Sequence, residues 1–211
     1  MQEILYCYDP LCGWCYGFSP VIERLEQDFG NQIKFTAYSG GMVTGERVSP
    51  IGQSFGYIKE ALKTVESRAS VQFGEPFKQL LEEGSYIYNS APPSKALTIY
   101  KSVSNGSSVA FAHALQKWLF YDGKSLNEVQ NLASIAEQHG LDAEVFTQLF
   151  EQDKYQQKTW EEFAFVQKIG VQGFPTLLFR DGQKLYLLSR GYQIYEVLEG
   201  SIKQILDGRV V

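Results

Sequence analysis

The spacing of hydrophobic residues differs between the two ends of the chain and its middle. At the ends, short runs that are continuously apolar or alternate with polar residues indicate β-strands at 4–8, 32–38, 176–179 and 185–189. Apolar residues three to four positions apart indicate helices at 21–29 and 194–206. Asp181-Gly182 between the last two strands is typical of a hairpin turn. The ends therefore predict a strand–helix–strand unit and a hairpin followed by a helix.

The middle of the chain, from about 45 to 168, has helical spacing and no alternating run of useful length. Ser49-Pro50 predicts the start of a helix, with serine as N-cap and proline as first residue. Trp118 and Trp160 lie on apolar helical faces and are expected in the core. The simplest α/β arrangement is a four-stranded mixed sheet flanked by helices. We predict a domain formed by 1–44 and 169–211, with an all-helical subdomain inserted at 45–168. Within it, apolar stripes mark helices at 96–103, 110–119, 129–136 and 145–150.

Composition narrows the class of protein. The 211 residues are 44% hydrophobic and 14% aromatic with a net charge of -5, which is typical of a compact globular protein. The chain has no Lys/Arg-rich run, and this disfavours nucleic acid as a partner. No apolar run approaches the roughly 18 residues of a membrane helix. The first residues lack the basic start and apolar run of a secretory signal. We expect a cytoplasmic protein with no membrane partner; its oligomeric state stays open.

All three cysteines lie within nine positions, as Cys7, Cys12 and Cys15. Cys12 and Cys15 enclose Gly13-Trp14 at the point where the first strand ends and the first helix begins. Free amides at a helix N-terminus stabilise an anion, so a thiolate is favoured at Cys12. Cys15 follows one helical turn later and can pair with it, while Gly13 and Trp14 tune the reduction potential of the pair. Cys7 lies in mid-strand and is expected to be a small buried hydrophobe.

A structural zinc site is the main alternative for these cysteines. Zinc takes four ligands, and His113 and His139 lie in the helical region without the spacing of a second ligand pair. We therefore predict no metal. Asp9, three residues before Cys12, is the nearby carboxylate; it either caps the turn or tunes the thiols.

A second motif, Gly173-Phe174-Pro175-Thr176, lies just before the third strand. A proline is tolerated at the first residue of a strand because its missing N–H lies outside the ladder. The two motifs, with the helical insertion between them, resemble the DsbA family of the thioredoxin superfamily. The run DPLCGWCYGF at 9–18 is similar to the cytoplasmic DsbA-like, FrnE-like branch of that family.

The resemblance implies a thioredoxin-like fold, βαβ…ββα with a large helical insertion. It also implies that Cys12 is the nucleophile and Cys15 the resolving thiol. Pro175 would follow a cis peptide bond and pack beside Cys12. Phe174, Pro175 and Thr176 would then bind substrate, with the Phe174 backbone pairing to a substrate strand.

Two departures from the family pattern accompany the resemblance. Thioredoxins and some DsbA relatives carry a buried acid in the central strands, and residues 4–8 contain none. Periplasmic DsbA proteins have a histidine between the cysteines, where this chain has Trp14. A strongly oxidising pair is therefore not expected.

The sequence favours a thiol–disulfide oxidoreductase that acts on protein or small thiol/disulfide substrates. It would need no bound cofactor beyond its redox-active disulfide, with glutathione as a candidate co-substrate. The alternative is a glutathione-dependent enzyme of the 2-hydroxychromene-2-carboxylate isomerase or kappa-class glutathione transferase type. Those families typically carry serine where Cys12 stands. A third hypothesis is a non-catalytic binding protein that uses the groove around Pro175. The natural substrate and the direction of electron flow stay open.

Overall fold

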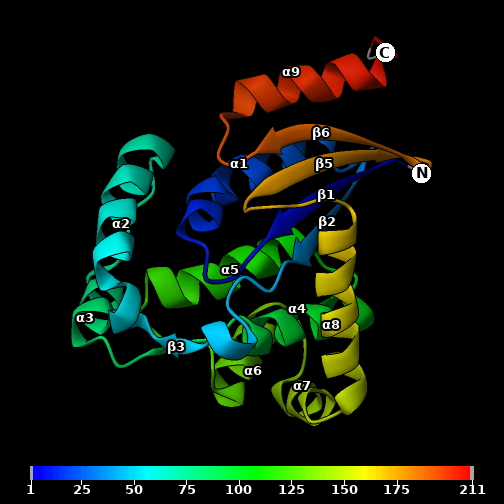
Figure 1. Cartoon of the computed structure of the whole chain (residues 1–211). Coiled ribbons are helices and arrows are strands. Elements are labelled where there is room, and N and C mark those ends of the chain that lie inside the picture. The colour runs from blue at the N-terminus through cyan, green and yellow to red at the C-terminus, as the bar shows by residue number, and fades with distance from the viewer. Residues whose placement is uncertain (1, 210–211) are drawn as a thin grey trace.

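A four-stranded mixed sheet lies at the centre of the computed structural model, which describes residues 2–209 (Figure 1). The strand order is β2-β1-β5-β6. β1 is parallel to β2 and antiparallel to β5, and β5 is antiparallel to β6. The helix α1 connects β1 to β2, and α9 follows β6. The predicted strand–helix–strand unit and hairpin–helix are therefore confirmed. Their bounds are β1 Gln2–Tyr8, α1 Gly13–Phe29, β2 Lys34–Ser39, β5 Thr176–Asp181, β6 Lys184–Arg190 and α9 Tyr195–Leu206.

The strand β1 is buried on both faces of the sheet. Tyr6 and Tyr8 belong to the main hydrophobic core, with residues of α1 and α9. Cys7 points to the opposite face and packs in a second cluster with Val166 of α8. Successive side chains of a strand alternate between faces, so Cys7 lies on the side of the sheet away from α1. It is fully buried, as expected.

The chain between β2 and β5 is mostly helical, as predicted, and its helices pack below and beside the sheet in Figure 1. Helix positions agree with the four apolar stripes, while α2, α3 and α8 lie outside them. The bounds are η1 Gly45–Arg47, η2 Ile51–Ser54, α2 Phe55–Ala69, α3 Glu75–Glu83, α4 Ala91–Val103, α5 Ser108–Phe120, α6 Val129–Gln138, α7 Ala143–Phe150 and α8 Asp153–Lys168.

The predicted helix start at Ser49-Pro50 is wrong. These two residues form the short strand β3 (Ser49–Pro50), antiparallel to β4 (Ile87–Tyr88). The Ile51 N–H continues the pairing by donating to Tyr86 O at 2.8 Å. Proline fits this short pair because the proline nitrogen has no hydrogen to donate and edge strands tolerate it. The middle segment therefore contains one small two-stranded ladder among its helices.

The main core runs without interruption from the sheet into the intervening helices. Ser108, at the start of α5, accepts a hydrogen bond from the Ala37 N–H of β2 at 3.0 Å. The domain boundaries at 44/45 and 168/169 stay a prediction.

Trp118 packs against the core as expected, but the expectation for Trp160 is wrong, since Trp160 is 46% exposed. It stands edge-on to Phe163 at the mouth of a cavity described below.

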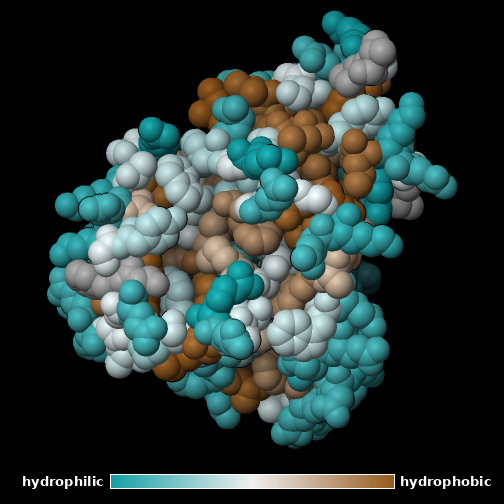
Figure 2. Space-filling view, viewed as in Figure 1, coloured by the Kyte–Doolittle hydropathy of each residue, from teal (hydrophilic) through white to brown (hydrophobic). Residues whose placement is uncertain are grey.

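The surface of one side of the molecule is uneven in polarity. Figure 2 shows hydrophobic residues near the top, where β6 and α9 lie, and tan or pale residues in the middle between α2 and α8. Hydrophilic residues border this middle region. Within residues 2–209, no helix combines the length and hydropathy needed to cross a membrane.

Candidate active site

Cys12 is the N-cap of α1. Its backbone is extended, with φ -88° and ψ 110°, and its Sγ accepts a hydrogen bond from the Cys15 N–H at 3.4 Å. An N-cap side chain ordinarily uses oxygen for this contact with the third helical residue. Here the sulfur takes that place, and the Cys15 N–H, which also donates to Cys12 O at 3.0 Å, is directed at Cys12 Sγ. The electrostatic setting expected for a thiolate is therefore built into the backbone.

Cys15 is the inner member of the pair. It is fully buried, whereas Cys12 is 7% exposed, and all three cysteines are free thiols in this structure. Burial raises the pKa of the Cys15 thiol well above its ordinary value, and the hydrogen bond and charge of Cys12 raise it further. Of the two thiols, Cys12 is therefore the more exposed, and Cys15 is the one whose ionisation burial disfavours.

The second motif contacts the first across 162 positions of sequence. Cys12 Sγ donates to the carbonyl oxygen of Phe174 at 3.5 Å, and the Phe174–Pro175 peptide bond is cis, as the resemblance implies. Thr176 Oγ1 donates to Gly173 O at 2.7 Å within the same loop. The Phe174 ring lies so close to Gly40 that a Cβ there would be 1.8 Å from it. Only glycine permits this approach, and the loop is thereby held against the end of β2.

Asp9 supports the turn that precedes Cys12. It is fully buried; Oδ1 accepts from the Leu11 N–H at 3.0 Å and the Ser90 hydroxyl at 2.9 Å, and Oδ2 from the Met42 N–H at 2.6 Å. Burial raises its pKa to about 6, and the three hydrogen bonds partly offset that rise. Asp9 is therefore more than a turn cap, because it also joins the turn to the loop after β2 and to the start of α4.

Gln116 is a site residue that sequence reasoning missed. It is fully buried on α5, and its Nε2 donates to Asp9 O at 3.1 Å and Cys12 O at 3.4 Å. Ser19 of α1 donates to Gln116 Oε1 at 3.1 Å. The side chain thus clamps both ends of the turn between β1 and α1. A glutamine on a mostly apolar helix was the only signal in the sequence, and it did not indicate contacts with residues more than 100 positions away.

An apolar cavity of about 240 Å³ opens directly beside Cys12. The first turn of α1, including Gly13 and Trp14, forms one wall, and α2 forms another with Ile58 and Leu62. The Trp14 ring also lies 6.1 Å from the ring of Tyr192, between centroids. None of the lining residues is charged. The structure thus brings all of the predicted site residues into one region, with α2 as an unpredicted wall.

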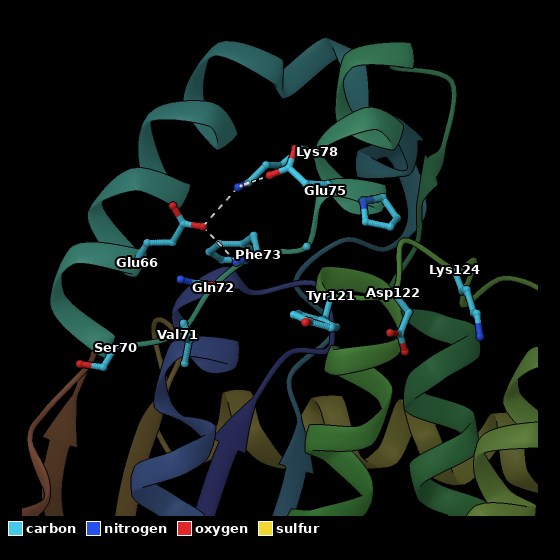
Figure 3. Close-up of a pocket in the computed structure, with 12 residues that line it drawn as sticks. Glu66, Ser70, Val71, Gln72, Phe73, Glu75, Lys78, Tyr121, Asp122 and Lys124 are labelled. Atoms are coloured by element: carbon cyan, nitrogen blue, oxygen red, sulfur yellow. Dashed lines mark hydrogen bonds and ion pairs between the residues drawn. The ribbon is translucent and has the colours of Figure 1, made fainter.

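A more spacious cavity, about 810 Å³, lies on the other side of this wall (Figure 3). Three of its charged groups pair with one another: Lys78 Nζ lies 3.7 Å from Glu66 Oε1 and 3.0 Å from Glu75 Oε1. Glu66 also accepts from the Phe73 N–H at 3.0 Å. No cysteine lines this cavity, so it is separate from the dithiol.

No cluster of three or more His, Cys, Asp or Glu side chains suited to a metal ion occurs among residues 2–209.

Comparison with known families identifies the class of the protein. The profile of the DSBA-like thioredoxin domain matches residues 3–203, nearly the whole chain. The chain belongs to this family, and its α/β thioredoxin-like fold with a helical insertion is the one predicted. The sequence and the fold thus agree that this chain is a member of the DSBA-like family that carries a C-x-x-C pair at Cys12 and Cys15.

Solved structures of similar proteins share this fold. One, provisionally assigned as a protein disulfide isomerase from Nitrosomonas europaea, has a TM-score of 0.87 and 24% identity, covering 99% of each chain. The cytosolic disulfide reductase DsbM from Pseudomonas aeruginosa has a TM-score of 0.82 and 24% identity, covering 97% of this chain and 98% of that one. DsbM has also been solved with GSH; that structure has a TM-score of 0.79 and 23% identity, and the match covers 97% of this chain and 99% of that one.

One curated relative is similar in sequence over part of its length. The ClpXP adapter protein SpxH from Halalkalibacterium halodurans is 25% identical over 146 residues, or 69% of this chain. The match covers 48% of SpxH, so the chain spans about half the length of this relative.

Proposed function

We propose that this protein is a thiol–disulfide oxidoreductase in which Cys12 is the nucleophile and Cys15 the resolving thiol. The observation that carries the proposal is the environment of Cys12 Sγ, which faces the Cys15 N–H at 3.4 Å and the Phe174 carbonyl at 3.5 Å. The amide stabilises a thiolate. The carbonyl lies beside the attacking atom, where an extended substrate segment can pair with the loop.

The reaction proceeds by two exchanges of sulfur bonds. The Cys12 thiolate attacks a substrate disulfide, forming a Cys12–substrate bond and releasing one substrate sulfur as a thiolate, which takes up a proton. Cys15 then loses its proton and attacks Cys12 Sγ, which releases the second substrate thiol and leaves a Cys12–Cys15 disulfide. The substrate gains two electrons and the dithiol loses them. Two equivalents of a small thiol such as glutathione restore the dithiol.

Burial of Cys15 favours this order of events. Its raised pKa keeps it protonated while Cys12 is a thiol or thiolate. Once Cys12 is held in a mixed disulfide, its negative charge is gone and one cause of the raised pKa of Cys15 disappears. Asp9 and Gln116 hold the turn in place during both steps. Gly13 and Trp14 line the apolar cavity, where they contact the substrate and tune the pair.

Protein or small disulfides in the cytoplasm are the proposed substrates. In a compartment kept reducing, net reduction or isomerisation is the favoured direction. The DsbM structure with GSH supports glutathione as the co-substrate. The glutathione-dependent isomerase or transferase stays the alternative function, and the retention of both cysteines argues against it. An adapter role, as the name of SpxH suggests for that protein, corresponds to the non-catalytic hypothesis.

The test is reduction of a fluorescent peptide disulfide by glutathione, with wild type, Cys12→Ser, Cys15→Ser and Cys7→Ala compared. We expect activity from wild type and Cys7→Ala only, and mass spectrometry should find a Cys12–Cys15 disulfide after mild oxidation. The proposal fails if Cys12→Ser retains activity. Glutathione binding that survives Cys12→Ser, without disulfide reduction, would favour the isomerase alternative. Normal cellular function of Cys12→Ala/Cys15→Ala would favour the binding protein.

A further inference from the structure

Another cavity shares Met42 with the apolar cavity beside Cys12, although no cysteine lines it. Its volume is about 590 Å³, and it lies between the loop after β2, the helix α8 and residues 171–174. Phe174 lines it as well, and the carbonyl of Phe174 accepts from Cys12 Sγ. A substrate attached to Cys12 would therefore contact the apolar cavity directly and could reach the other one past Met42 and Phe174.

The two cavities differ in charge. The apolar one has no charged lining residue, whereas the second has a single one, Arg47. The Arg47 side chain donates from Nη2 to Gly41 O at 3.2 Å. Among the salt bridges of residues 2–209, none involves Arg47, in contrast to Lys78 in the cavity of Figure 3, which is paired with Glu66 and Glu75. The charge of Arg47 lowers the pKa of Asp9 slightly against the effect of burial, but the oxygens of Asp9 are already occupied by three donors.

The loop that carries Arg47 is held at its beginning, at Gly41 and Met42, whereas Arg47 itself is exposed. Its Gly41 has φ +66°, and a Cβ there would lie 2.7 Å from the ring of Phe163, which is buried on α8. The next residue, Met42, donates its N–H to Asp9. A guanidinium has five N–H donors in a planar fork, and one of these groups is used by Gly41 O. The remaining donors are presented on a preordered loop, where a carboxylate is the matching ligand.

We propose that Arg47 forms a carboxylate-binding subsite that selects disulfide substrates with a carboxylate near the reacting cysteine. The inference deepens the proposed oxidoreductase function and rests on it. The carboxylate would lie at Arg47, with Trp160 as an exposed aromatic wall, while an apolar group of the substrate enters the cavity under α2. The chain has a net charge of -5, so a local cation offsets the repulsion that an anionic substrate otherwise meets.

The test uses two peptide disulfides that differ only in Asp or Asn beside the cysteine, with wild type, Arg47→Gln and Arg68→Gln. Arg68 is an exposed arginine that lines neither cavity, so its variant matches the change in charge. We expect Arg47→Gln to raise the KM of the Asp peptide about tenfold with kcat unchanged, and to leave the Asn peptide unaffected. An equal change for both peptides, or the same change with Arg68→Gln, would overturn the subsite.

Binding measurements distinguish failure of this inference from failure of the proposed function. Peptides with an S-methylated cysteine cannot react, so their dissociation constants report the subsite even if no reduction occurs. Preference for the Asp peptide that is lost in Arg47→Gln supports the subsite; equal affinity for both peptides overturns it. Oxidised glutathione and its tetramethyl ester identify the source of the carboxylate. If Arg47→Gln weakens the binding of the Asp peptide and also of oxidised glutathione but not of its ester, the subsite accepts small disulfides as well; an effect on the Asp peptide only assigns a protein segment.

Discussion

Cys7 and Cys12 are five residues apart, both are less than 10% exposed, and their surroundings give them different chemistry. Cys7 lies in mid-strand, where its neighbours in the sheet are Tyr38 and Thr176 and its side chain packs against Val166. Burial raises its pKa to about 12, and the charge of Glu162 adds to the effect. Cys12 instead caps a helix, where a backbone N–H is directed at its sulfur.

The comparison shows that exposure alone does not identify a reactive thiol in this fold. What differs is the backbone around the sulfur. In β1, the N–H and C=O groups on both sides of Cys7 are used by the sheet and none is free to stabilise a negative charge. At the start of α1, the Cys15 N–H is shared between Cys12 O and Cys12 Sγ, so part of its hydrogen-bonding capacity is directed at the sulfur. A helix start placed directly after a strand therefore provides reactivity that the strand itself does not.

The largest expected effect is the contrast between these two cysteines in catalysis. We expect Cys12→Ser to lower kcat/KM for disulfide reduction by about 1,000-fold or more, because a hydroxyl cannot exchange with a disulfide. Cys7→Ala should stay within about twofold of wild type. The glutathione-coupled reduction assay measures both. A large loss of activity in Cys7→Ala, with its fold intact by circular dichroism, would remove the distinction between the two thiols.

The next effect is the pH dependence contributed by Asp9. Its pKa of about 6 lies above the ordinary value of about 3.9, so the folded protein holds this proton more tightly than the unfolded chain. The free energy of unfolding should therefore fall by roughly 3 kcal/mol between about pH 4 and pH 6 on this account. Asp9→Asn cannot titrate and should lack this decline. Urea unfolding of the reduced proteins from pH 4 to 7 measures it, and parallel curves would refute it.

A smaller effect is expected at Gln116. Gln116→Leu keeps the side-chain volume but removes the donors to Asp9 O and Cys12 O, at a cost of roughly 1–3 kcal/mol. Closing the Cys12–Cys15 disulfide strains the same turn, so we expect the clamp to be weaker in the oxidised form and its loss to make the reduction potential of the pair more negative, by about 10–30 mV. Thr159→Val, which removes another fully buried hydrogen-bonding group far from the turn, is the control. Redox titration should show a shift in Gln116→Leu only; equal shifts would contradict the clamp.

The smallest effect concerns the stability contributed by Cys7. Cys7→Ala removes one buried sulfur from the cluster with Leu5, Val166 and Leu178, and should lower the free energy of unfolding by about 1 kcal/mol. Chemical denaturation measures this value. In native wild type, iodoacetamide should label Cys12 and leave Cys7 unmodified until the protein unfolds. Rapid labelling of Cys7 in the native state would show that this face of the sheet opens.

The sequence predicts the reactive residues of the site better than the residues that surround them and hold them in place. Cys12 and Cys15 are close in the chain, and a local motif at a strand–helix junction was enough to place them. Pro175 was placed by resemblance. Gln116 and Arg47 could not be found this way, because their roles depend on contacts between segments that only the folded chain brings together. Ser49-Pro50 misled because the same dipeptide fits a helix start and an edge strand, and its pairing with Tyr88 decides between them.

The hydrogen bond from Cys12 Sγ to the Phe174 carbonyl links two events that are usually considered separately. In the substrate-free protein this carbonyl accepts from the thiol, and it is also the group that we propose pairs with a substrate strand. An incoming substrate N–H would therefore compete with the thiol for the same oxygen. Docking of a substrate strand and release of the sulfur from this contact would then be a single event, so the loop that binds substrate also sets the freedom of the attacking atom.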